Sequence, residues 1–95
     1  PTTYYALALL YTQYFEKNIN KKTLGLALKY VNQYISKSPQ NPKGYFLRGR
    51  ISYSLNNLNM AIDSYQTILG LVSEKSPEYR MARINIKRIQ DERSR

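Results

Sequence analysis

The chain has 95 residues and a formal net charge of +9, and 42% of its residues are hydrophobic. This length fits one compact domain, and this hydrophobic content argues against intrinsic disorder. The longest apolar run, residues 6–10, is far shorter than the roughly 18 residues that span a bilayer. Cysteine and histidine are absent, which excludes disulfides, the commonest general base and the commonest transition-metal ligand. We expect a soluble domain of the cytoplasm or the periplasm.

Two apolar stripes of helical period occupy the first 37 residues. The first predicts a helix over residues 3–17, with an inward stripe of Tyr4, Leu7, Ala8, Tyr11, Tyr14 and Phe15. The polar segment 18–22 predicts a connection. The second stripe predicts a helix over residues 22–37, which ends before Ser38-Pro39 because proline lacks an amide hydrogen. Its inward residues are Leu24, Ala27, Leu28, Val31, Tyr34 and Ile35.

Capping residues mark the starts of three further helices. Asn41-Pro42 begins the third, because asparagine caps a helix and proline suits its first position. Asn56-Asn57 ends the third helix and caps the fourth, whose stripe is Leu58, Ala61, Ile62, Tyr65, Ile68, Leu69 and Val72. Ser76-Pro77 begins the fifth, over residues 77–92, with Tyr79, Ala82, Ile86 and Ile89 inward.

The expected fold is all-α. No stretch alternates polar and β-branched residues between glycine turns, so the sequence predicts no sheet. Helices joined by such short connections pack as antiparallel hairpins. We expect helix pairs over residues 3–37 and 42–73 and a capping helix over 77–92, in a single domain of residues 1–95. Because the chain begins at Pro1 without methionine, we expect a piece of a longer protein.

One apolar pattern occurs twice at an offset of 34 residues. Leu24, Ala27, Val31 and Tyr34 correspond to Leu58, Ala61, Tyr65 and Ile68. A helix pair repeated at this period resembles the tetratricopeptide family, and Tyr45 and Gly49 also match its pattern. Gly49 would let two helix backbones approach closely. The chain departs from the family at Arg48, in the extra residues between its first two helices, and in a third unit that is only half present. The resemblance implies a short right-handed solenoid of about five helices and a non-catalytic protein-binding module.

In the resembled family, the first helices of the pairs line a concave groove that receives a peptide. The matching positions here are Tyr5, Leu9, Thr12, Gln13, Lys43, Phe46, Leu47, Arg50, Tyr53, Ser54, Arg80, Met81, Ile84 and Lys87. Arg50, Arg80 and Lys87 would pair with partner carboxylates, so we expect a protein or peptide partner with an acidic segment. Alternatively, these cations are solvated or pair with Asp63 or Glu78.

No pattern in the sequence indicates catalysis. The six acidic residues fall on different turns or at helix ends, and the four glycines are too scattered for a phosphate-binding loop. We therefore expect no enzyme, no cofactor and no metal.

Two other functions remain open. The charge and ten tyrosines suit a helical-repeat RNA binder. Most of the tyrosines fall on inward stripes, and Tyr5 and Tyr53 are better placed for contact. The other alternative is self-association through the fifth helix, which would present Ile84, Ile86 and Ile89 uncovered.

Overall fold

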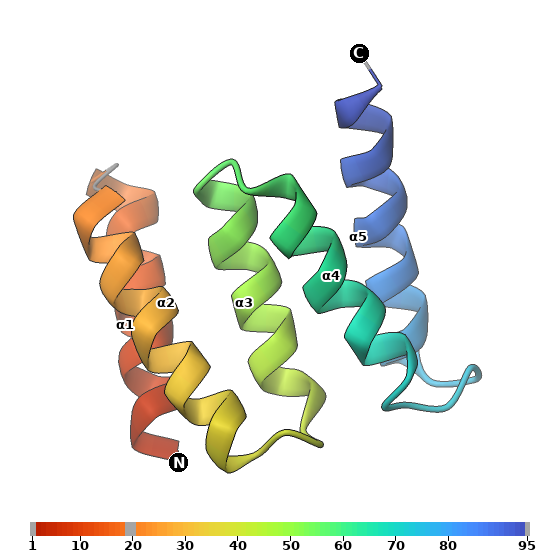
Figure 1. The fold of residues 1–95 in the computed structure, drawn as a ribbon, viewed down its shortest axis with the longest axis horizontal. Coiled ribbons are helices and arrows are strands. Elements are labelled where there is room, and N and C mark those ends of the chain that lie inside the picture. Colours follow the sequence, from red (N-terminus) through yellow and green to blue (C-terminus); the bar gives the residue numbers. More distant parts are fainter. Residues whose placement is uncertain (1, 19–20, 95) are drawn as a thin grey trace.

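A computed structural model describes the backbone of residues 2–18 and 21–94 and the side chains of residues 3–10, 12 and 22–94. These residues contain five helices and no strand, which confirms the all-α prediction. The helices are α1 (Thr2–Asn18), α2 (Lys21–Lys37), α3 (Pro42–Ser54), α4 (Leu58–Leu69) and α5 (Pro77–Arg93). Each helix packs against the next one in the chain, and α1 also contacts α3. Consecutive helices run in opposite directions (Figure 1) and form a flat body of 35 × 33 × 17 Å.

The predicted caps are present at three helix starts. The side chain of Asn41 accepts a hydrogen bond from the amide of Lys43, and that of Asn57 accepts one from the amide of Met60. Ser76 Oγ accepts from the amide of Tyr79. Just before the α4 cap, Asn56 has a φ of 61°, a left-handed conformation that asparagine tolerates better than most residues. These local signals explain why the predicted starts of α3, α4 and α5 agree with the structure.

The end of α4 differs from the prediction. Its apolar stripe extends to Val72, but the helix ends at Leu69, and Gly70 is its C-cap. Val72 lies outside the helix and still packs against the core. Its apolar character therefore reflects burial and not helical structure.

None of the described helices is long and apolar enough to span a membrane.

Two hydrophobic clusters form the core and meet at α3. The first joins α1, α2 and α3 and contains Ala8, Leu24, Ala27, Val31, Leu47 and Ile51. The second joins α3, α4 and α5 and contains Tyr45, Ala61, Ile62, Tyr65, Ile68, Ala82, Ile86 and Ile89. Ile35 packs against both clusters. The connection between α2 and α3 is fixed by two hydrogen bonds, because Tyr45 donates to the Pro39 carbonyl and Asn41 donates to the Tyr34 hydroxyl.

Gly49 marks a close contact between α3 and α4. A Cβ atom at this position would lie 2.6 Å from the ring of Tyr65. The sequence predicted that two helix backbones approach closely here, whereas the structure places an aromatic side chain, not a second backbone, against this glycine. Glycine is required because the ring occupies the space of the missing side chain.

Candidate functional site

The main candidate site is a hollow of about 500 Å³ between α3 and α5, with one residue of α4 at its floor. We call it the α3/α5 groove. Its lining residues are Phe46, Arg50, Tyr53, Ser54, Tyr65, Met81, Asn85 and Arg88. Phe46 meets Tyr65 edge to face, with ring centroids 6.1 Å apart. The groove therefore combines an aromatic floor with two arginine side chains, one from each wall.

The two arginines act on the same buried hydroxyl. Burial raises the pKa of Tyr65, and the positive charges of Arg88 and Arg50 act in the opposite direction. Burial also raises the pKa of Tyr5 on α1, as does its neighbour Tyr34, while Arg50 again lowers it. Arg50 thus lies close enough to α1 and to α4 to influence both tyrosines. The two arginines therefore give the groove a positive charge.

A polar contact joins α3 to α5 at one end of the groove. The hydroxyl of Tyr53 lies 2.8 Å from both carboxylate oxygens of Glu92, to which it donates. The guanidinium of Arg88 lies 5.2 Å from the centre of the Tyr53 ring. The bond to Glu92 raises the pKa of the Tyr53 hydroxyl above its ordinary value of 10.0. This contact links the two walls of the groove.

Of the α3 residues predicted to face the groove, Phe46, Arg50, Tyr53 and Ser54 line it. Lys43 is exposed nearby, with its ammonium 4.3 Å from the centre of the Tyr5 ring. Leu47 does not fit the prediction, since it is buried in the cluster with α1 and α2. It lies on the face of α3 that packs on the preceding helices.

On α5 the predicted face is rotated by about one residue. Met81 lines the groove as expected, and it is joined by Asn85 and Arg88. Arg80 instead donates to the carbonyl of Lys75, and Lys87 lies 3.8 Å from Asp91 and lines a different hollow. Ile84 is 66% exposed and does not line the groove.

The rotation follows from the position of the α5 cap. Ser76 lies 35 residues after Asn41, whereas the apolar pattern of α2 and α4 repeats after 34. One extra residue in the connection turns a helix face by about 100°. Arg88 was therefore absent from the predicted groove residues. Its spacing of seven residues from Met81, which is two helical turns, was the signal that could have revealed it.

The predicted α1 residues form part of the core. Thr12 is fully buried, and its hydroxyl donates to the carbonyl of Ala8 at 2.7 Å. Tyr5 and Leu9 are partly buried and pack against the α1–α3 cluster. Ala8 of the predicted stripe and Thr12 of the predicted groove face therefore both point inward, and the side chains of Tyr11, Tyr14 and Phe15 lie outside the described residues. The side chain of Gln13 lies outside the described residues.

Arg48, which departs from the family pattern, is held between α3 and α4. Its Nε donates to Ser64 Oγ at 2.8 Å, and its guanidinium lies 3.6 Å from an oxygen of Asp63. The same group lies 5.2 Å from the centre of the Tyr45 ring. An arginine is tolerated at this position because α4 supplies a hydroxyl and a carboxylate.

The self-association surface predicted on α5 is smaller than expected. Ile86 and Ile89 are buried against α4, so the prediction that they lie uncovered is wrong. Of those three isoleucines, Ile84 alone remains exposed.

The remaining predictions concern tyrosines and metal ligands. Tyr34 and Tyr65 are buried as predicted, Tyr79 is half-buried, and the side chains of Tyr11 and Tyr14 lie outside the described residues. Across the side chains that the structure describes, no three acidic residues gather closely enough to hold a metal ion.

Comparisons of the chain with protein-family models, with curated proteins and with solved structures gave no match.

Proposed function

We propose that this chain is a tetratricopeptide-like protein-interaction module whose α3/α5 groove binds an acidic peptide segment of a partner protein. The 34-residue pattern of α2 and α4 and the antiparallel packing of consecutive helices support an arrangement as a short right-handed solenoid. In such an arrangement the surface formed by α1, α3 and α5 is the binding surface.

The observation that carries this proposal is the position of Arg50 and Arg88, which lie on opposite walls of a hollow with an aromatic floor. A guanidinium presents a planar set of donors that matches a carboxylate, and the apolar surroundings strengthen such a bond relative to bulk water. Phe46, Tyr65 and Met81 supply apolar surface for the rest of the peptide. The chain's net charge of +9 would speed the approach of an acidic partner.

The test is a fluorescence anisotropy titration with acidic, neutral and basic peptides of equal length. The acidic peptides should bind most tightly. The double variant Arg50→Gln, Arg88→Gln should bind them at least about tenfold more weakly, since each charge-assisted hydrogen bond contributes roughly 1.5 kcal/mol or more.

The matched control is the double variant Lys29→Gln, Lys37→Gln, which removes the same charge from exposed positions on α2. It should change the affinity by less than about twofold. Equal losses in the two double variants would reduce the effect to net charge and contradict the groove. A single-stranded RNA probe belongs in the same titration. Binding of RNA without binding of acidic peptides would favour the RNA alternative.

A further inference from the structure

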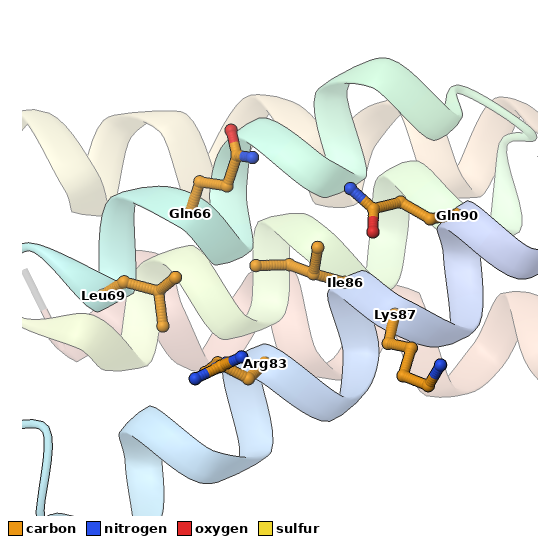
Figure 2. A pocket seen from close by; sticks show the side chains of 6 residues that line it. All are labelled: Gln66, Leu69, Arg83, Ile86, Lys87 and Gln90. Atoms are coloured by element: carbon orange, nitrogen blue, oxygen red, sulfur yellow. The ribbon is translucent and has the colours of Figure 1, made fainter.

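Residues of α5 that do not line the groove form a second surface. Arg80, Arg83, Ile84 and Lys87 are all exposed, and we call them the α5 outer face. Beside it lies a hollow of about 350 Å³ between α4 and α5 (Figure 2), lined by Gln66, Leu69, Arg83, Ile86, Lys87 and Gln90. In Figure 2, Ile86 lies between the two helices, and Lys87 extends away at the edge. This surface is cationic around a small apolar centre.

The molecule itself shows what covers the equivalent surface of α3. The caps of α3 and α5 are 35 residues apart, so Tyr45, Arg48 and Gly49 correspond to Arg80, Arg83 and Ile84. All three α3 positions are covered by α4. Tyr45 belongs to the α4 cluster, Arg48 pairs with α4 side chains, and Gly49 contacts the ring of Tyr65. The α5 outer face is thus the place where the repeat geometry of this chain puts another helix.

The chemistry of this covering helix follows from the same correspondence. Arg83 takes the place of Arg48, whose partners on α4 are the carboxylate of Asp63 and the hydroxyl of Ser64. Within the described residues Arg83 has no such partner. Arg80 and Lys87 add two further positive charges on the same face. Ile84 replaces a glycine, so it can pack against a small or aliphatic side chain but leaves no room for a ring like that of Tyr65.

We propose that the α5 outer face docks an acidic amphipathic helix of a partner protein, in the way that α4 covers α3. A second copy of this chain fits less well. Each copy carries 15 basic and 6 acidic residues, and α4 has a single carboxylate, Asp63. Pairing two cationic faces would bring like charges together, which is unfavourable. Neither the repeat geometry nor the charges of the α5 outer face depend on the α3/α5 groove.

The experiment is a selection from displayed amphipathic helices of about 18 residues, or five turns. Leucine forms one stripe, and the flanking positions vary among Glu, Gln and Lys. The selected helices should be rich in Glu. Their affinity should fall about tenfold in Arg83→Glu, because one charge-assisted bond becomes a repulsion, and it should also fall in Ile84→Gln. Both residues are exposed, so neither substitution should unfold the chain.

Three comparisons make the test specific. Lys29→Glu, an equal charge change on α2, should leave binding unchanged. A selected helix with one Glu replaced by Lys should regain affinity for Arg83→Glu. The groove variant Arg50→Gln, Arg88→Gln should still bind the selected helices. This last comparison separates failure of this proposal from failure of the groove proposal.

Several results would overturn the inference. One is a selection that yields neutral or basic helices, or no helix above background. Another is binding that is lost in the groove variant but kept in Arg83→Glu, which would place the helices in the α3/α5 groove. A dimer that dissociates in Ile84→Gln during analytical ultracentrifugation would identify the occupant as a second copy and exclude the acidic helix.

Discussion

Helices α2 and α4 place residues 34 positions apart in similar surroundings, yet they pack against their neighbours differently. Ala27 and its counterpart Ala61 are both fully buried, and Tyr34 and its counterpart Ile68 are both buried. The difference lies at Val31 and its counterpart Tyr65. Valine fits an ordinary helix contact, whereas the tyrosine ring fills the space above Gly49 on α3. One repeat pattern thus accommodates side chains of different size when the facing helix changes with it.

The largest effect should come from removing a fully buried side chain of the second hydrophobic cluster, which joins α3, α4 and α5. Ile68→Ala should lower the free energy of unfolding by about 3 kcal/mol, because it removes apolar contacts and leaves a cavity. Val31→Ala, in the first cluster, which joins α1, α2 and α3, should cost roughly half as much because valine loses fewer atoms. Urea unfolding followed by circular dichroism measures both. Since α3 and Ile35 join the two clusters, each variant should unfold in a single transition. Two separate transitions would show that the clusters are independent.

The next effect tests the match between Gly49 and Tyr65. Gly49→Ala should destabilise the chain by about 2 kcal/mol, although alanine favours helices, because its Cβ would overlap the tyrosine ring. Tyr65→Val copies the residue at the matching position of α2. The double variant Gly49→Ala, Tyr65→Val should lose less stability than the sum of the losses in the two single variants. Gly25→Ala is the control. Its Cβ would meet no atom within 4 Å, so it should stabilise the chain by roughly 0.5 kcal/mol. Additive effects of Gly49→Ala and Tyr65→Val would refute the match.

The smallest effect concerns the contact between α3 and α5. Tyr53→Phe removes the hydrogen bond to Glu92 and should cost about 1 kcal/mol. The pKa of Tyr53 is raised in the folded chain, so its contribution should be complete below the ordinary value of 10.0. It should be lost as the pH rises through the raised pKa. The stability gap between wild type and Tyr53→Phe should therefore narrow above pH 10. A constant gap up to pH 11 would contradict this assignment.

Helix positions were predictable because their signals are local. Asn41-Pro42, Asn57 and Ser76-Pro77 fix three helix starts through their own side chains and ring geometry. These signals depend on neighbours only a few residues away. The same reasoning identified the inward stripes of α2 and of α4, where polar and apolar faces are clearly separated.

The direction of two helix faces was harder to predict. Apolar residues surround α1, so the predicted stripe contained Ala8 but not Thr12, and both are fully buried. On α5, one extra residue in the preceding connection turned the face and brought Arg88 to the groove in place of Lys87. Both errors concern how a helix rotates against its neighbours, which depends on tertiary packing and not on period alone.

An acidic segment that binds between α3 and α5 should change the amide NMR signals of the residues that line the groove. Amide ¹H–¹⁵N shifts would be followed as an acidic peptide is added to the chain. We predict that the largest changes fall on groove residues such as Phe46, Arg50, Met81 and Arg88, and that they disappear in the double variant Arg50→Gln, Arg88→Gln. Changes centred on α2, or spread evenly over the basic surface, would contradict it.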